Sequence, residues 1–253
     1  MRRVLVTGAS TGLGLALARH YLAQGASVGV TSRREEALAT AYQDQPAALR
    51  LVADVRDAAS MRDAAQRFLE RIGPPDLVIG NAGVSVGTLT DHAEDVAQFR
   101  GVIETNLLGL VHTFQPFLAP MRAAGCGVLA GIASVAGVRG LPGAGAYSAS
   151  KAAAITYLES LRVELRGSGV DVVTVCPGYI RTPMTERNPY RMPFILDADE
   201  AARRIARVIA ARRRLAVVPW QMAVVARVLR LLPPAVYDNL FARAPRKPRA
   251  GGG

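Results

Sequence analysis

The feature that most constrains this chain is a glycine-rich turn close to its N-terminus. Residues 3–7, Arg-Val-Leu-Val-Thr, are rich in β-branched residues, as in a buried strand. Residues 8–14 read Gly-Ala-Ser-Thr-Gly-Leu-Gly, and a helix with periodic apolar residues follows to about Gln24. Glycines allow a tight turn and a close backbone approach, while the helix N-terminus offers unpaired N–H groups to an anion. The order of strand, glycine loop and helix therefore predicts a dinucleotide-binding fold rather than a plain βα turn.

The same alternation of strand and helix continues along the chain. Further strands are predicted at residues 27–32, 48–53, 76–80, 127–133, 170–175 and 215–218, and one long helical pattern covers residues 91–124. This rhythm predicts an α/β protein with a parallel sheet and helices on both faces. The chain has 253 residues and no internal repeat, so we expect one domain.

The end of the second predicted strand bears on the choice of cofactor. Ser32 is followed by Arg33 and Arg34. In doubly wound folds an acidic residue at this place binds the ribose 2′-hydroxyl of NAD, whereas arginine accommodates the 2′-phosphate of NADP. The sequence therefore favours NADP(H), and the alternative is that both arginines are solvated charge opening the next helix.

Two asparagines lie where a ligand could be bound. Asn81-Ala82-Gly83 follows the strand at 76–80, at the edge where open α/β sheets bind ligands, although such residues are also ordinary in turns. Asn106 lies inside the long helical pattern, where asparagine is either a surface residue or a hydrogen-bonding group with a function. The pattern alone leaves both alternatives open.

Tyr147 and Lys151 form the strongest candidate for chemistry. Four residues apart on a helix, they share one face, so that an ammonium can lower the pKa of the phenol and suit it to proton transfer. The alternative is a solvated surface pair. Of the 31 Lys and Arg residues only Lys151 and Lys247 are lysine, which indicates that position 151 prefers a compact ammonium to a guanidinium.

Taken together, these residues resemble the classical short-chain dehydrogenase/reductase family over about residues 3–209. The motifs that carry the resemblance are Thr7-Gly8-x-x-x-Gly12-x-Gly14, Asp54, Asn81-Ala82-Gly83, Asn106, Ser134, Tyr147-x-x-x-Lys151 and Pro177-Gly178. The resemblance implies a single-domain Rossmann fold with a doubly wound, seven-stranded parallel sheet. It also implies a catalytic tetrad of Asn106, Ser134, Tyr147 and Lys151.

The resemblance further assigns roles to these side chains. A hydride passes between the nicotinamide and a carbonyl carbon, Tyr147 gives the proton to the developing alkoxide, and Ser134 hydrogen-bonds that oxygen. Lys151 lowers the pKa of Tyr147 and holds the ribose hydroxyls, and Asn106 anchors a water that relays protons. The expected cofactor-binding residues are Gly8, Ser10, Thr11, Gly12, Leu13, Gly14, Ser32, Arg33, Arg34, Asp54, Val55, Asn81, Ala82, Gly83, Tyr147, Lys151, Pro177, Gly178, Ile180 and Thr182.

One position departs from the family pattern. Many NADP-dependent relatives carry a basic residue in the glycine loop, where this chain has Thr11. The preference for NADP therefore rests on Arg33 and Arg34.

Residues 181–197 correspond to the substrate lid of the family. The segment contains Met184, Tyr190, Met192 and Phe194, which favours a hydrophobic carbonyl substrate. The alternative is that these side chains pack the loop onto the core.

The C-terminal part differs in composition from the rest. We expect a catalytic domain at residues 1–218, an apolar helical extension at 219–241 and a basic, disordered tail at 242–253. Because most of the net charge of +11 lies in this last fifth, no nucleic-acid partner is expected. The apolar run is shorter than the ~20 residues that span a bilayer, so it forms either a subunit contact in a dimer or tetramer, or a peripheral membrane contact through 219–249.

These observations predict an NADP(H)-dependent carbonyl reductase or alcohol dehydrogenase. The alternative is a catalytically lapsed NADP-binding regulatory or membrane-associated scaffold protein. No metal-ligand pattern is present. Cys126 and Cys176 are each flanked by glycine or by apolar, strand-like residues, which favours buried thiols over a disulfide framework. With no signal peptide evident, we expect a cytoplasmic location, with membrane association open.

Overall fold

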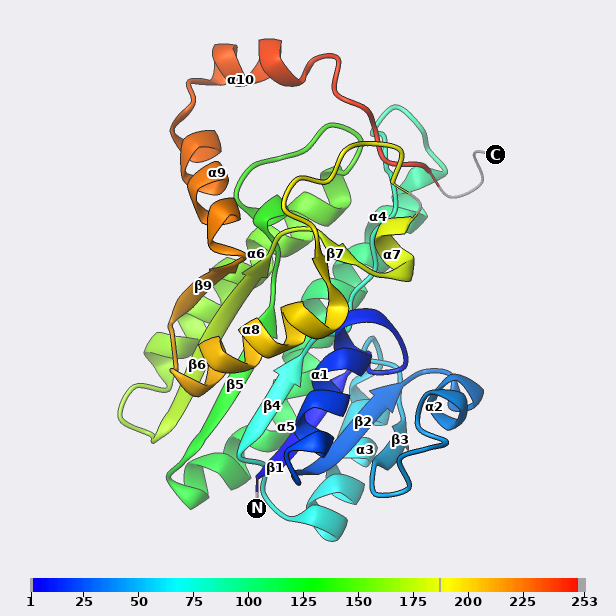
Figure 1. The fold of residues 1–253 in the computed structure, drawn as a ribbon, viewed down its shortest axis with the longest axis vertical. Coiled ribbons are helices and arrows are strands. Elements are labelled where there is room, and N and C mark those ends of the chain that lie inside the picture. Colours follow the sequence, from blue (N-terminus) through cyan, green and yellow to red (C-terminus); the bar gives the residue numbers. More distant parts are fainter. Residues whose placement is uncertain (1, 187, 250–253) are drawn as a thin grey trace.

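Seven parallel strands form the central sheet of the computed structural model, which describes residues 2–186 and 188–249 (Figure 1). They lie in the order β3-β2-β1-β4-β5-β6-β9, which confirms the predicted sheet. The strands are β1 (Arg3–Thr7), β2 (Ser27–Ser32), β3 (Leu49–Val52), β4 (Leu77–Gly80), β5 (Gly127–Ile132), β6 (Val170–Pro177) and β9 (Leu215–Val218). The order reverses between β1 and β4, which opens a crevice at their carboxyl ends.

Helices cover both faces of this sheet. One face carries α1 (Gly12–Ala23), α2 (Glu35–Ala41) and α8 (Ala198–Ala210), and the other carries α3 (Ala58–Ile72), α5 (Gly109–Ala124) and α6 (Gly145–Glu164). Side chains alternate along β1, where Val4 and Val6 point to the first face and Leu5 to the second. The core is therefore two apolar layers that hold the strand ends in register.

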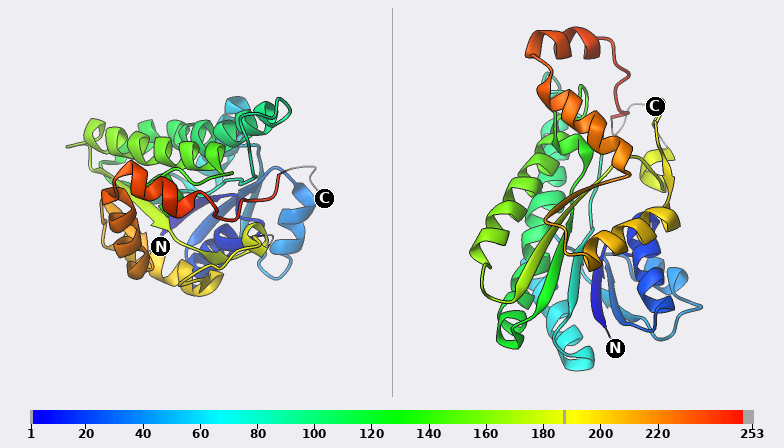
Figure 2. Two further views of the ribbon diagram at one scale, coloured as in Figure 1. Left: turned by 90° about the horizontal axis from the view of Figure 1, so that it is seen from above. Right: turned by 60° about the vertical axis from the view of Figure 1, so that its left-hand side comes forward.

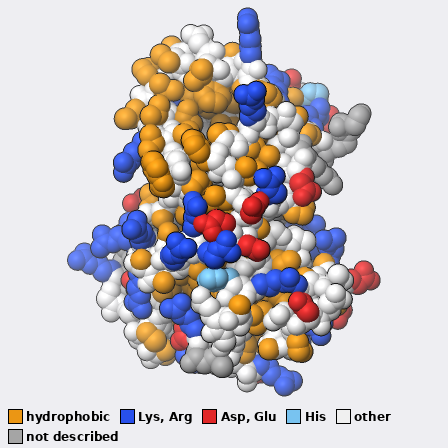
Figure 3. All heavy atoms as spheres, viewed as in Figure 1, with side chains coloured by type: hydrophobic (Ala, Val, Ile, Leu, Met, Phe, Trp, Pro, Cys, Tyr) orange, Lys and Arg blue, Asp and Glu red, His pale blue; other side chains and the backbone are white. Residues whose placement is uncertain are grey.

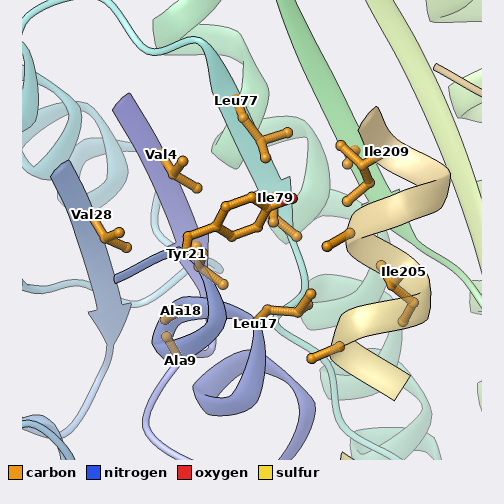
Figure 4. Packing of buried hydrophobic residues seen from close by; sticks show 14 of the residues in the cluster. Val4, Ala9, Leu17, Ala18, Tyr21, Val28, Leu77, Ile79, Ile205 and Ile209 are labelled. Atoms are coloured by element: carbon orange, nitrogen blue, oxygen red, sulfur yellow. The ribbon is translucent and has the colours of Figure 1, made fainter. Parts of the chain in front are cut away.

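Figure 4 shows the layer under α1 and α8. Tyr21 and Leu17 of α1 lie over Val4 of the sheet, and Ile205 and Ile209 of α8 pack beside them; all five are at most 2% exposed. Because α8 comes late in the chain, this packing ties the C-terminal third to the glycine-loop region. It fixes the helix that follows the loop against the sheet.

The long helical pattern predicted for residues 91–124 is divided in the structure. It consists of α4 (Asp95–Ile103), a π-helical turn η1 (Glu104–Leu108), and α5. The π turn widens the helix by one residue, and π turns are frequent at functional sites. Asn106 lies in this turn and is 2% exposed, so it is not a surface residue.

Short elements and the C-terminal extension complete the fold. A two-stranded sheet, β7 (Ile180–Arg181) with β8 (Leu196–Asp197), brackets α7 (Pro183–Glu186). The predicted apolar extension forms α9 (Trp220–Leu231) and α10 (Pro234–Phe241). No helix of the described residues is long and apolar enough to cross a membrane.

The residues after α10 differ from the expected disordered tail. Figure 2 shows this last segment running back over the molecule, and Lys247 and Arg249 form hydrogen bonds with residues 85–95. Composition alone predicts disorder here, because it does not reveal that carboxylates lie within reach. Residues 250–253 lie outside the described part of the chain.

Candidate active site

The carboxyl ends of the strands meet at a cleft of about 390 Å³. Every cofactor-binding residue predicted from the sequence lines this cleft, and so does Ser134. Asn106 lies behind its wall. The structure thus brings together segments from residue 8 to residue 182 that the sequence pattern treated separately.

The glycine loop forms one end of the cleft. Gly8 and Gly12 have φ angles of +63° and +55°, a region that favours glycine. A Cβ on Gly14 would lie 2.3 Å from the Gly8 carbonyl oxygen and 2.4 Å from Asn81 Nδ2, so no side chain fits there. The first turn of α1 has neither a side-chain cap nor an acidic residue, which leaves its N–H groups available to an anion.

Asn81 connects the end of β4 to this loop. Its Nδ2 donates to the carbonyl oxygens of Thr7 at 3.0 Å and Gly8 at 3.3 Å. The Thr7 hydroxyl in turn accepts from the backbone N–H groups of Asn81 and Ala82 at 3.1 and 3.2 Å. These bonds hold the glycine loop in one position relative to the sheet.

The other side of the loop carries the residues expected at the adenosine end. Arg33 and Arg34 are exposed, and among the described residues Arg33 has no carboxylate within ion-pair distance. Asp54, by contrast, is paired with Arg56 at 2.6 Å, and hydrogen bonds from Arg56 lower the pKa of Asp54. Ser10 and Ser32 hydroxyls lie 3.2 Å apart between these groups. This end of the cleft therefore presents net positive charge.

Ser134, Tyr147 and Lys151 line the same cleft. Ser134 follows β5 and caps a 3₁₀ turn through a 3.1 Å bond from the Ala136 N–H. Tyr147 lies in the first turn of α6, and the Lys151 ammonium is 5.9 Å from its ring centroid. The predicted helical pairing is present, and the lysine is 4% exposed rather than a surface residue.

Burial controls the proton affinities of this cluster. It lowers the pKa of Lys151 to about 8, while the Lys151 Nζ donates to the Ile132 carbonyl oxygen at 2.8 Å. Burial also raises the pKa of Tyr147, against the opposing effect of its hydrogen bond with Ser134. This direction differs from the one expected from the sequence, because desolvation of the phenolate outweighs a cation that is directed at a backbone carbonyl.

Asn106 acts on the backbone beside this cluster. Its Oδ1 accepts from the Val84 N–H at 2.8 Å, and its Nδ2 donates to the Val84 carbonyl oxygen at 3.0 Å and to Ser150 Oγ at 2.9 Å. A Cβ on Gly83 would lie 3.2 Å from Asn106 Oδ1 and 3.5 Å from Lys151 Nζ. The π turn thus places an amide that holds the turn after β4 close to the lysine.

The segment after β6 closes the cleft. The Gly178 N–H donates to the Val218 carbonyl oxygen at 2.8 Å, and Thr185 Oγ1 donates to the Ile180 carbonyl oxygen at 2.6 Å. These bonds position Thr182 and the start of the lid. Within the lid, Met184 and Phe194 are exposed, and the Tyr190 ring lies 6.4 Å from that of Tyr179.

Several cleft residues were not predicted from the sequence. They are Thr31, Ala53, Arg56, Val84, Thr105, Ile132 and Ala133, whereas Pro183, Met184 and Thr185 belong to the predicted lid. Most are neighbours of predicted residues, and strand ends extended by one position would have found them. Arg56 was missed because only the fold shows that it pairs with Asp54. Among the described residues, no group of three or more His, Cys, Asp or Glu could hold a metal.

The cleft is lined by a glycine loop before an uncapped helix N-terminus and by a serine, a tyrosine and a lysine, an arrangement typical of nucleotide-dependent oxidoreductases with a Rossmann fold. The profile of the short chain dehydrogenase family matches residues 2–191. The chain therefore belongs to the short-chain dehydrogenase family, whose members bind nicotinamide cofactors, act on small molecules and are commonly oligomeric.

Individual relatives agree with this assignment. An uncharacterized oxidoreductase of Myxococcus xanthus is 38% identical over 96% of this chain and 97% of its own length. The 2-(R)-hydroxypropyl-CoM dehydrogenase of Xanthobacter autotrophicus is 37% identical over 73% of this chain and 77% of its own. A crystal structure of a single-residue variant of actinorhodin polyketide ketoreductase with NADPH has a TM-score of 0.78 at 30% identity, covering 86% of this chain and 95% of that one.

Proposed function

We propose that the protein is an NADP(H)-dependent carbonyl reductase or alcohol dehydrogenase. The observation that carries this proposal is the convergence of Ser134, Tyr147 and Lys151 in the cleft that the glycine loop also lines. A serine hydroxyl, a phenol and an ammonium can together deliver a proton to a carbonyl oxygen. Membership of the family and the similarity to a ketoreductase support the same reaction class.

The cleft fits a nicotinamide dinucleotide. The missing Cβ of Gly14 and the open N-terminus of α1 suit a pyrophosphate, and Asn81 holds the loop in place. When bound, the cofactor supplies or accepts a hydride at the nicotinamide. We assign Pro177, Gly178, Ile180 and Thr182 to the nicotinamide, because they line the same cleft as Tyr147 and Lys151.

The protein's own residues then manage the proton. Tyr147 gives its hydroxyl proton to the carbonyl oxygen of the substrate, and Ser134 donates a hydrogen bond to that oxygen as negative charge develops. Lys151 holds the ribose hydroxyls and stabilises the phenolate left behind. Asn106 fixes the backbone at Val84, and its role in a water relay to Lys151 stays a prediction.

The preference for NADP rests on charge. Arg33 is exposed at the cleft without a carboxylate partner among the described residues, so it is free to pair with a 2′-phosphate. Asp54, the nearby carboxylate, is already paired with Arg56, which reduces its repulsion of that phosphate. A hydrophobic carbonyl substrate is favoured by the exposed Met184 and Phe194 of the lid.

Replacing Tyr147 with phenylalanine tests the reaction. We expect the turnover number for ketone reduction to fall at least about 100-fold, the contribution of a general acid, while the NADPH dissociation constant changes little. Arg62→Phe, on the exposed side of α3 and outside the cleft, is the control, and we expect it to leave the turnover number unchanged. Near-normal turnover in Tyr147→Phe would show that Tyr147 is not the proton donor. If the wild type oxidises NADPH with no compound in a broad carbonyl panel, the lapsed scaffold replaces this proposal.

The C-terminal helices give a second, separate proposal: they form an interaction surface. Trp220 and Leu231 are 69% and 81% exposed, and Val224, Val228, Val236 and Leu240 are exposed as well. Figure 3 shows hydrophobic side chains gathered on this side of the molecule, with arginines among them. We propose that a second copy of the chain covers this face, with an anionic membrane as the alternative occupant. A cytoplasmic location is part of the same proposal.

A further inference from the structure

The chain doubles back after α10. The C-terminal strap, residues 245–249, lies on the segment that leads to α4 (Figure 1; Figure 2 shows it from two more sides). The Gly87 N–H donates to the Pro248 carbonyl oxygen at 2.9 Å, and Gly87 and Arg249 form a parallel β-bridge. The strap therefore has a defined register on the body of the protein.

Arg249 anchors the end of this strap. Its Nε and Nη2 donate to the two carboxylate oxygens of Asp95 at 2.8 and 3.1 Å, and Nη2 also reaches Glu94 Oε1 at 2.7 Å. The Asp95 side chain is 3% exposed, and its carboxylate also accepts from the Leu89 N–H at 2.8 Å. A two-pronged contact of this kind fixes position and direction together.

Two glycines on the body leave room for the strap. A Cβ on Gly87 would lie 2.2 Å from the Lys247 carbonyl oxygen. Gly143 has a φ of +70°, and a Cβ there would lie 2.8 Å from the Arg246 Cβ. A side chain at either glycine would displace the strap.

Lys247 is the strap residue whose side chain lies next to Tyr147. Its ammonium lies 5.7 Å from the ring centroid of Tyr147 and donates to Ser85 Oγ at 2.6 Å. The side chain is partly buried, and in the described ranges no carboxylate lies within ion-pair distance of it. Burial lowers the pKa of Lys247 to about 8, so the group is still mostly protonated at pH 7.

The rarity of lysine in this chain indicates that position 247 requires an ammonium group. Lys247 and Lys151 are the only lysines among 31 Lys and Arg residues, and both ammonium groups lie within 6 Å of the Tyr147 ring centroid. An ammonium has three donor hydrogens, and Lys247 uses one of them on a neutral hydroxyl. A partly buried cation without a counterion is costly unless a ligand supplies the negative charge.

We propose that the C-terminal strap completes the substrate site and that the Lys247 ammonium binds an anionic group of the carbonyl substrate; this inference rests on the proposed function. The substrate is then amphiphilic. Its keto group meets Ser134 and Tyr147, its charged group meets Lys247, and its apolar part meets the lid.

The test compares charged and neutral forms of one ketone. Short oxo-carboxylates, from pyruvate to 5-oxohexanoate, are assayed beside their methyl esters with NADPH. Keto sulfonates and keto phosphonates form further arms that distinguish the kind of anion. We expect Lys247→Met to lower the ratio of kcat/KM for the best anion to that for its neutral form about 10- to 100-fold, the range of a charge-assisted hydrogen bond.

Two controls separate charge from position. Arg243→Gln removes an exposed cation just ahead of the strap, and we expect the ratio to stay within about twofold of the wild type. Gly87→Ala lifts the strap without changing any charge and lowers the ratio as Lys247→Met does. Gly101→Ala, where a Cβ meets no atom within 4 Å, is its matched control. An unchanged ratio in Lys247→Met overturns the proposal.

A binding measurement makes the result independent of turnover. Calorimetry on the NADP-loaded protein compares the same acids and esters, and we expect the best anion to bind at least about tenfold more tightly than its ester, a difference that Lys247→Met removes. If this contrast is present but no carbonyl compound is reduced, the proposed reaction fails and the anion site stands. Equal binding of acid and ester to the wild type refutes the anion site.

Discussion

Replacing Lys151 with methionine is expected to make the folded protein more stable at neutral pH while removing a catalytic group. Lys151 is 4% exposed, and burial lowers its pKa from 10.5 to about 8. The native state therefore disfavours the charged form that the unfolded chain carries at pH 7. A methionine side chain is similar in length to lysine, but it carries no charge and can be buried without a desolvation cost.

The size of the effect follows from the shifted pKa. At 1.36 kcal/mol for each pH unit, keeping Lys151 charged at pH 7 costs about 3 kcal/mol of folding free energy. Methionine removes this cost but also removes the 2.8 Å bond from the charged ammonium to the Ile132 carbonyl oxygen, which contributes about 1.5–3 kcal/mol. We therefore expect a net gain of up to about 1.5 kcal/mol in the free energy of unfolding at pH 7.

The pH dependence gives a sharper test. Between about pH 8 and 10.5 the unfolded chain binds a proton at Lys151 that the native state has lost, so wild-type stability rises with pH. From pH 7 to pH 9 this group alone contributes a rise of about 1 kcal/mol, and Lys151→Met loses that part. Lys247 titrates in the same range in both proteins, so the difference between their slopes isolates Lys151. Above pH 9 the buried Cys176, whose pKa is raised to about 11, opposes the trend.

Urea denaturation followed by circular dichroism at pH 7, 8 and 9 measures these quantities. Arg62→Met, which removes an exposed cation from α3, is the control and is expected to leave the pH dependence of wild type intact. A Lys151→Met protein that is less stable than wild type at pH 7, or that keeps the wild-type slope, would refute the reasoning. Cofactor is left out of both samples, because its binding would stabilise only the native state.

Two further predictions follow from the charged and apolar surfaces. Arg33→Asp is expected to raise the NADPH dissociation constant about 10- to 100-fold and the NADH constant far less, measured by cofactor fluorescence; an unchanged NADPH affinity contradicts the 2′-phosphate assignment. Trp220→Glu with Leu231→Glu is expected to shift the wild-type oligomer to a smaller species in sedimentation velocity. If the wild type is a monomer and co-sediments with anionic liposomes, while a chain ending at Val218 does not, the face binds membrane instead.

Much of the site could be predicted from the sequence because its residues belong to short motifs, each only a few positions long. The glycine loop, Asn81-Ala82-Gly83 and the Tyr147–Lys151 pair each depend on neighbours within a few positions, and strand ends of a parallel sheet converge by rule. The residues that the sequence assigns to the cofactor therefore line one cleft, and their role in binding it stays a prediction. Local spacing and one topological rule suffice for this part.

Other features of the site depend on contacts between residues that lie far apart in the sequence. The π turn at Asn106 has the same apolar pattern as an α-helix, so only the structure places its amide on Val84. The pKa of Tyr147 moves up rather than down because burial is a property of the whole fold. Lys247 and Ser85 are 162 positions apart, and a tail rich in proline and arginine carries no pattern that predicts their hydrogen bond.

The chemistry of the two lysines gives a reason for the contact between Lys247 and Ser85. Arginine would hold its charge more firmly, but its wide guanidinium spreads five donors in a plane, whereas an ammonium directs a compact charge at one oxygen. Lys151 uses this property on the Ile132 carbonyl oxygen and Lys247 uses it on Ser85 Oγ. Burial lowers the pKa of each to about 8. Both ammonium groups lie within 6 Å of the Tyr147 ring centroid, so the strap places a second compact charge beside the proposed proton donor.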